Sequence, residues 1–246
     1  MKLYAISCEA LVRECSRAAA LSPHVVTVSF QAFGLHNTPD ELRAKIQEEI
    51  DGASGGKNDY ILLAYGLCSR GTADLVARNV PLVIPRAHDC ITFFLGSKER
   101  YQQEFSSRPG TYYYSPGWVE RKEGEVDQGG FTIVKDSERE ARFKEYVEKY
   151  GEDNAAFLME QESQWLDHYN RAAFIDMGIG DIDYYRRFTQ EVARTHGWAY
   201  EELQGDFRLV DLLFGGNWDA DDFLIVQPGQ RTVEDVNSGI ISAVDA

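Results

Sequence analysis

The sequence lacks any long apolar run. No hydrophobic stretch approaches the roughly 18–20 residues that a membrane-spanning helix needs, so a transmembrane protein is not expected. The N-terminal segment MKLYAISCEALVREC carries Glu9 and Arg13 close behind a short apolar stretch. This pattern is not that of a secretory signal peptide.

Positive charge is scarce. The chain has 25 Lys and Arg against 40 Asp and Glu, which gives a formal net charge of -15. Such a surface repels phosphate backbones and anionic lipid, so we expect neither nucleic acid nor a membrane as partner. A local basic pocket for a small anion remains compatible with this balance, because net charge describes the whole surface.

Cysteine is also scarce, with 4 in the chain, at positions 8, 15, 68 and 90. Because no secretion signal is present, we expect a cytoplasmic protein with reduced thiols. Cys15 falls on the apolar face of a predicted helix and is expected in the core. Taken singly, the other three also suit a core, since cysteine is often buried.

The first part of the chain alternates predicted strands and helices. The strands are predicted at Lys2–Ser7, Val25–Ala32, Tyr60–Tyr65 and Pro81–Pro85, and the helices at Glu9–Leu21, Thr38–Asp51, Gly71–Asn79 and Asp89–Ser106. Thr38, Pro39 and Glu41 have the spacing of a capping box with proline at the first helical position. The alternation predicts an α/β fold, with a doubly wound, Rossmann-like parallel sheet in a lobe of residues 1–110.

The remaining residues, 111–246, are less regular. An aromatic connector at Arg108–Glu120 and an acidic surface loop at Glu123–Gly130 precede predicted helices at Ser137–Tyr150, Asn154–Tyr169 and Ile182–His196. Strands are expected at Ala172–Asp176, Trp198–Leu203 and Phe223–Gln227. This order predicts either a second, smaller α/β lobe or an extension of the first sheet.

Cysteine and histidine gather at the predicted strand ends. The four strands of the first lobe run out into Cys8-Glu9, Gly34-Leu35-His36, Gly66-Leu67-Cys68 and Arg86-Ala87-His88-Asp89-Cys90. Open parallel sheets bind ligands beyond the carboxyl ends of their strands, so these side chains are predicted to meet. Three thiolates and one imidazole form a typical zinc set, or that of another transition metal. We therefore predict a metal site of Cys8, Cys68, His88 and Cys90.

Other polar residues border this predicted site. Glu9 and Asp89 are candidates for a catalytic base or for orienting a neighbouring ligand. The glycine-containing loop 66–72 is expected to open a helix, to receive an anion and to lower the pKa of Cys68. His36 is a further metal ligand, a substrate contact or an ordinary loop residue. The predicted substrate-binding residues are His36, Ser69, Arg70 and Arg86.

Several segments resemble a known family. CEALVREC, YILLAYGLCSRGT, PLVIPRAHDCITFFLGSKERY and PGTYYYSPGW occur in order over roughly residues 1–120, and FLIVQPG is similar too. They resemble the family catalogued as domain of unknown function 1638. The resemblance implies a context of corrinoid-dependent methyl transfer, with corrinoid as a candidate cofactor and a corrinoid protein as a candidate partner. The residues that match its motifs are Cys8, Glu9, Cys68, His88, Asp89 and Cys90.

Three functions fit these residues. The first is a zinc-dependent enzyme acting on a small molecule, with Arg70 or Arg86 holding an anionic group and methyl transfer to or from a thiol as one version. The second is a protein that binds or delivers a metal or a cofactor such as a corrinoid. The third is a metal-free thiol enzyme, in which Cys68 or Cys90 is the nucleophile and His88 its base.

Overall fold

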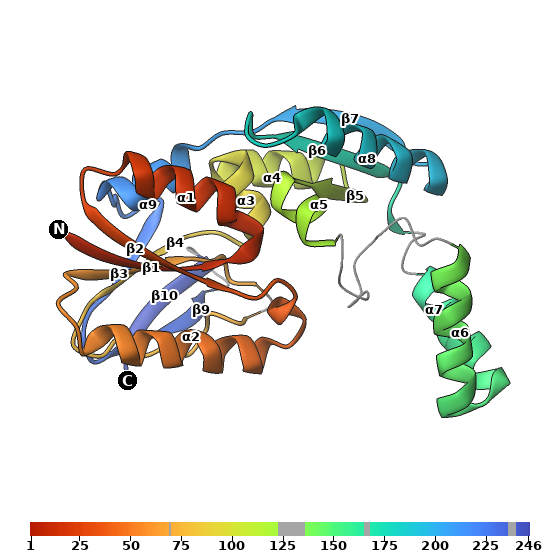
Figure 1. Ribbon diagram of the computed structural model, residues 1–246. Helices are drawn as coiled ribbons and strands as arrows, with labels where there is room; N and C mark the ends of the chain where they lie inside the picture. Colours follow the sequence, from red (N-terminus) through yellow and green to blue (C-terminus); the bar gives the residue numbers. More distant parts are fainter. Residues whose placement is uncertain (69, 123–135, 165–167, 236–239) are drawn as a thin grey trace.

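A computed structural model describes residues 1–68, 70–122, 136–164, 168–235 and 240–246. These residues form a mixed α/β protein with a five-stranded, a three-stranded and a two-stranded sheet (Figure 1). The predicted α/β class is therefore confirmed. No helix in these residues is both long enough and apolar enough to cross a membrane.

The five-stranded sheet has the order β2-β1-β3-β4-β8. Its strands are β1 (Lys2–Cys8), β2 (Val25–Gln31), β3 (Tyr60–Ala64), β4 (Leu82–Pro85) and β8 (Phe223–Val226). The first four run parallel, as predicted, and β8 pairs antiparallel with β4. The last predicted strand thus extends the first sheet, which was one of the two alternatives.

Helices cover both faces of this sheet. On one face α1 (Val12–Leu21), α3 (Cys90–Leu95) and α9 (Arg208–Gly215) pack on Leu3 and Ala5. On the other, α2 (Pro39–Ser54) packs on Ile6 (Figure 1). Apolar side chains on both faces of each strand explain why the strands are near-continuous hydrophobic runs.

The connections reverse direction at β1. Helix α1 leads from β1 to its neighbour β2, and α2 then returns the chain across β1 to β3 on the far side. Because the two connections pass over opposite faces, the carboxyl ends of β1 and β3 flank a switch point. Open α/β sheets bind ligands at such a point.

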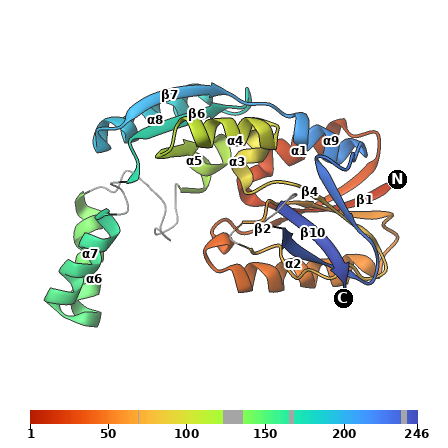
Figure 2. The same ribbon diagram turned by 180° about the vertical axis from the view of Figure 1, so that it is seen from behind.

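The three-stranded sheet is also parallel. Its order is β5-β6-β7, with β5 (Thr111–Tyr114), β6 (Arg171–Asp176) and β7 (Ala199–Gln204). Helix α8 (Ile182–His196) lies against it, α4 (Lys98–Ser107) leads into it, and α5 (Pro116–Lys122) follows β5. Figure 2 shows this sheet beside α3 and α4 of the first half. The division of the chain at residue 110 stays a prediction.

Two further pairs of elements complete the described chain. Strands β9 (Gln230–Asp235) and β10 (Ile240–Asp245) pair antiparallel, and Ile241 packs on the same sheet face as α2. Helices α6 (Asp136–Tyr150) and α7 (Glu152–Gln164) pack on each other, and both figures draw them apart from the sheets. The predicted acidic loop Glu123–Gly130 lies outside the described residues.

Three local predictions are wrong. Residues 71–79 form a turn and an isolated bridge between Val76 and Arg231 instead of a helix, because the amides of Asp74 and Ala77 donate to Thr232 and Gln230 of β9. The Thr38 side chain does not cap α2, since its hydroxyl bonds to the Leu35 carbonyl and the Glu41 carboxylate instead. The connector 108–120 contains the helix α5, which was predicted as loop and extended chain.

Candidate functional site

Three cysteines stand at three strand exits of the first sheet. Cys8 ends β1, and its sulfur accepts the Ala10 amide at 3.4 Å at the start of the 3₁₀ turn Glu9–Leu11. Cys68 follows β3, and its amide donates to the His88 carbonyl at 3.0 Å. Cys90 begins α3. The backbone bond between the loops after β3 and β4 brings Cys68 next to the segment that carries Cys90.

The three thiols influence one another. The charge of Cys8 raises the pKa of Cys68, and the charges of both raise the pKa of Cys90, so the three thiols are electrostatically coupled. All four cysteines are free. Within the described residues, no three Cys, His, Asp or Glu side chains already form a group that could hold an ion. Metal binding would therefore require these side chains to turn toward one another.

Burial makes these thiols weak acids. It raises the pKa of Cys8 to about 11 and raises the pKa values of Cys68 and Cys90 further. The expected low pKa of Cys68 is wrong for two reasons. No helix follows its loop, and the loss of hydration penalises the thiolate.

The backbone at Cys68 is strained. Cys68, Arg70 and Asp74 have φ angles of 46°, 72° and 62°, in the left-handed region that favours glycine. For a residue with a Cβ atom this conformation costs about 1–2 kcal/mol. Strain of this kind is concentrated at functional sites. A glycine at position 68 would remove the strain, but it would also remove the thiol.

His88 and Asp89 lie at the rim of the thiol group. His88 is exposed, and its ring stacks on Tyr101 with centroids 5.7 Å apart. Asp89 accepts the Ile91 amide at 2.9 Å, as the N-cap of α3, and the Tyr101 hydroxyl at 3.0 Å. Burial raises the pKa of Asp89, although these hydrogen bonds oppose the shift. Asp89 is thus held in place, and Tyr101 links it to the histidine ring.

Glu9 and His36 join the exit of β2 to the same edge. The Glu9 carboxylate accepts the Phe33 amide at 2.9 Å and so tethers the chain that leaves β2. The His36 ring lies 5.7 Å from the Phe33 ring and 6.1 Å from the Trp118 ring, between centroids. His36 therefore borders α5, the helix that carries Trp118.

Helix α5 forms a wall beside the thiols. Gly117 packs so tightly on the 3₁₀ turn after Cys8 that a Cβ atom there would lie 1.9 Å from the Ala10 carbonyl oxygen. Trp118 packs edge-on against Phe33 with ring centroids 5.0 Å apart, and its indole lowers the pKa of the Cys90 thiol against the larger effect of burial. From the sequence, the aromatic segment Thr111–Trp118 is expected either to wall a pocket or to form a buried connector strand, and only the helix α5 was not predicted. Pro116 at the first helical position was the signal that could have revealed the helix.

Two more groups face Cys8 and were not predicted. The positive charge of Arg121 on α5 lowers the pKa of Cys8, against the larger effect of burial. Tyr65 directly follows β3 and is 3% exposed. Burial is the main cause that raises the pKa of the Tyr65 hydroxyl, and the charges of Cys8 and Cys68 raise it further. These two groups add a guanidinium and a phenol to the predicted set.

The predicted anion-binding residues contact the C-terminal strands. Arg70 pairs with Glu234 of β9 at 3.1 Å. Arg86 donates to the Ile241 carbonyl of β10 at 2.6 Å and to the Ala220 carbonyl at 3.0 Å. Ser69 lies outside the described residues. A role of these residues in substrate binding stays a prediction.

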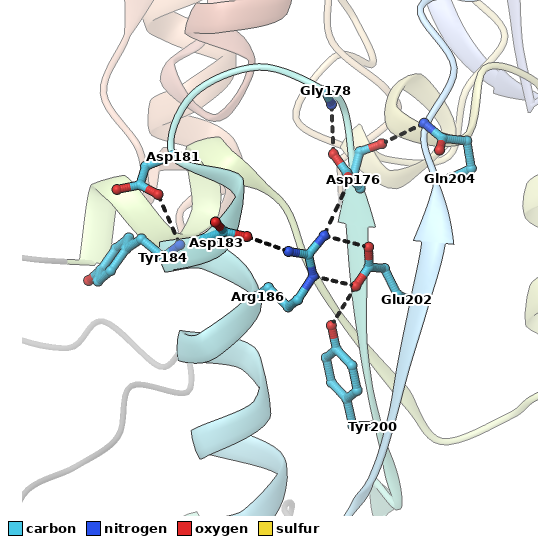
Figure 3. Close-up of polar contacts among 9 residues, drawn as sticks. All are labelled: Asp176, Gly178, Asp181, Asp183, Tyr184, Arg186, Tyr200, Glu202 and Gln204. Atoms are coloured by element: carbon cyan, nitrogen blue, oxygen red, sulfur yellow. Dashed lines mark hydrogen bonds and ion pairs between the residues drawn. The ribbon is translucent and has the colours of Figure 1, made fainter.

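The carboxyl edge of the second sheet is built differently. Arg186 of α8 donates to Asp183 at 2.6 Å and to Glu202 of β7 at 2.7 Å, as Figure 3 shows. The Glu202 carboxylate also accepts the Tyr200 hydroxyl at 3.0 Å. The Arg186 guanidinium also lies 3.8 Å from Asp176 at the end of β6. Arg186 and the three carboxylates that it contacts, on Asp176, Asp183 and Glu202, are therefore paired with one another, which is typical of a structural network.

Fold and site together define a class. The molecule is a mixed α/β protein with half-buried thiols at the carboxyl edge of a mostly parallel sheet. Its sequence matches the family described as "Protein of unknown function (DUF1638)" over residues 30–213, and the chain belongs to that family, as the motifs predicted. The match includes Cys68, His88 and Cys90, whereas Cys8 precedes it. Neither the curated proteins nor the solved structures include a match to the chain.

Proposed function

We propose that this protein is a zinc-dependent enzyme that acts on a small-molecule thiol, with Cys8, Cys68, Cys90 and His88 as the metal ligands. The observation that carries the proposal is the placement of three cysteines after three parallel strands, at the one sheet edge that holds the switch point between β1 and β3. Sulfur and imidazole donors suit zinc, and another transition metal would use the same set.

The cost of keeping Cys68 supports a chemical role for its thiol. A cysteine in the left-handed conformation is less stable than glycine, so stability alone does not favour it. A structural zinc usually supports a small domain that lacks a core. Here the sheet carries buried apolar side chains on both faces, so it does not need such support.

The acidity of the thiols favours a metal over a free cysteine nucleophile. Burial raises the pKa values of Cys8, Cys68 and Cys90, so without a cation they are protonated near pH 7. A thiol nucleophile needs a lowered pKa or an adjacent base. The His88 ring stacks on Tyr101 instead of serving as that base in the described arrangement.

Zinc held by Cys8, Cys68, Cys90 and His88 would lower the pKa of a substrate thiol that takes the coordination position of the exposed His88, and the thiol would so become nucleophilic. Asp89, held by the Ile91 amide and the Tyr101 hydroxyl, accepts the thiol proton. Glu9 fixes the loop at Phe33, and with it His36, at the border of the site. In the methyl-transfer version the substrate sulfur bonds to the methyl carbon, and the donor keeps the electron pair of the broken bond.

The partner and the location are part of the proposal. The family resemblance suggests a corrinoid protein as the methyl donor, so the corrinoid belongs to that partner and not to this chain. Free thiols support a cytoplasmic location. The strand order and the switch point support a Rossmann-like kinship for the first sheet.

A methyl-transfer assay tests the function. Zinc-loaded protein is mixed with methylcobalamin and 2-mercaptoethanol, and the loss of methylcobalamin absorbance is followed. We expect the wild-type protein to accelerate the transfer, Cys68→Gly not to, and the core variant Cys15→Ala to match the wild type. Zinc binding without acceleration would favour the delivery function instead. Failure to bind zinc would overturn the proposed site.

A further inference from the structure

Two hydrogen-bond donors stand beside the thiols without a partner among the described residues. They are the Tyr65 hydroxyl and the Nε atom of Arg121, and both atoms are buried. A buried polar atom without a hydrogen bond costs about 1–3 kcal/mol. Two such atoms next to a candidate site are typical of groups that bind a ligand.

The fold brings these donors to Cys8 from two directions. The last paired residues of β1 and β3 are Ser7 and Ala64, so Cys8 and Tyr65 leave neighbouring strands side by side. Arg121 comes from α5, which Gly117 seats on the Ala10 carbonyl just after Cys8. Tyr65 thus lies on the sheet side of Cys8, and Arg121 lies on the side of the α5 wall.

Three carboxylates around this edge are already bonded elsewhere. Glu9 accepts from Phe33, and Asp89 accepts from Ile91 and Tyr101. Glu120, next to Arg121, accepts from Arg13 and from the Tyr185 hydroxyl. A guanidinium and a phenol, both hydrogen-bond donors, are therefore the groups near the thiols that remain available to a ligand. Their chemistry is complementary to an oxyanion, which Arg binds through charge-assisted hydrogen bonds.

We propose that the small-molecule thiol carries an oxyanion group, such as a carboxylate, which Arg121 and Tyr65 bind while its sulfur faces Cys8, Cys68 and Cys90. This inference rests on the proposed function and names its substrate class. It differs from the prediction that Arg70 or Arg86 holds the anion, because those guanidiniums contact β9 and β10.

A pair of matched thiols tests the inference. Zinc-loaded protein is titrated calorimetrically at pH 7 with 3-mercaptopropionate and with 3-mercapto-1-propanol, which replaces the carboxylate by a hydroxymethyl group. We expect the wild-type protein to bind the acid at least ~10-fold more tightly, as a charge-assisted hydrogen bond predicts. Arg121→Gln and Tyr65→Phe should each reduce this preference, whereas Arg70→Gln and Arg86→Gln should keep it.

The outcomes separate the two proposals. If zinc binds and the wild-type protein takes both thiols equally well, the oxyanion inference is overturned while the zinc site stands. The inference is also overturned if Arg70→Gln or Arg86→Gln, and not Arg121→Gln, removes the preference. If zinc does not bind, the proposed function itself fails. Tyr65→Phe keeps the ring, so a normal unfolding temperature for this variant shows that the fold is intact.

Discussion

The two parallel sheets end differently at their carboxyl edges. At the second sheet, Arg186 bonds to Asp183 and Glu202 and lies near Asp176, so charges there are paired (Figure 3). At the first sheet, the exits and α5 carry half-buried thiols, a strained Cys68 and donors on Tyr65 and Arg121 that have no hydrogen-bond partner among the described residues. The two edges share strand geometry but differ in how completely their polar groups are satisfied.

This difference indicates which edge serves a ligand. A satisfied ion-pair network stabilises its own elements and leaves no group to bind a small molecule. Unsatisfied donors and backbone strain lower stability, and they persist where function requires them. The predictions below test this contrast, from the largest expected effect to the smallest.

Glu14 on α1 should give the largest effect, through pH. It is 0% exposed, both carboxylate oxygens lack a hydrogen-bond partner among the described residues, and burial raises its pKa from 4.5 to about 7. Because the folded protein favours the protonated carboxyl, the contribution of Glu14 to the free energy of unfolding is complete below pH 4.5. It is lost as pH rises through 7, which lowers the free energy of unfolding by about 3 kcal/mol. Glu14→Gln should remove this loss, measured as urea unfolding at pH 5 and pH 8. The same pH dependence in both proteins would contradict the assignment.

Gly117→Ala should displace the wall beside the thiols. The added Cβ atom would lie 1.9 Å from the Ala10 carbonyl oxygen, so α5 has to move. We expect a loss of about 2–3 kcal/mol in the free energy of unfolding, by overpacking. Gly52→Ala in α2 is the matched control. Nothing lies within 4 Å of its Cβ position, and the change should stabilise the helix by up to about 1 kcal/mol. Equal stability of the Gly117→Ala and wild-type proteins would refute the close packing.

Cys68 should show a trade-off between stability and function. Cys68→Gly and Cys68→Ala both remove the thiol, but only glycine relieves the left-handed backbone at φ 46°. The glycine variant should therefore be more stable than the alanine variant by about 1 kcal/mol in urea unfolding. If alanine proves as stable as glycine, the strain argument for Cys68 fails.

Arg186 should affect stability only. Arg186→Ala removes the partner of Glu202 and should lower the free energy of unfolding only slightly, because the pair is partly exposed and screened by solvent. Arg186 holds the pKa of Glu202 below its usual 4.5, so this contribution is present near neutral pH and is lost as pH falls through the lowered pKa. Zinc content should be unchanged. A loss of zinc in this variant would place the second edge in the functional site.

The sequence could predict the strand ends and the residues at them. Strands that are buried on both faces of a sheet are continuous apolar runs, and such runs predicted the four parallel strands. Because these strands are parallel, Cys8, Cys68 and Cys90 follow them at one edge of the sheet. Cys15 was predicted to lie in the core, and this is confirmed because its side chain is 0% exposed. These predictions succeeded because they depend on local pattern and on a general rule of sheet geometry.

The errors arise from contacts between distant parts of the chain. Residues 71–79 have helical composition, but their amides bond to β9, far along the sequence. The pKa of Cys68 depends on burial, and its φ angle depends on how the loop after β3 meets the loop after β4. Arg121 could not be assigned to the site without α5 and its packing on Ala10. Local propensity contains none of this information.

The zinc content of protein purified without oxygen tests the central claim most directly. We expect one zinc per chain in the wild-type protein and no stoichiometric zinc in Cys8→Ser, Cys68→Gly and Cys90→Ser. Cys15→Ala is the matched control, because Cys15 lies in the core with its sulfur 3.3 Å from the Ser7 hydroxyl, and it should keep its zinc. Equal zinc in the wild-type and Cys68→Gly proteins, or none in the wild type, would contradict a zinc site at the carboxyl edge of the first sheet.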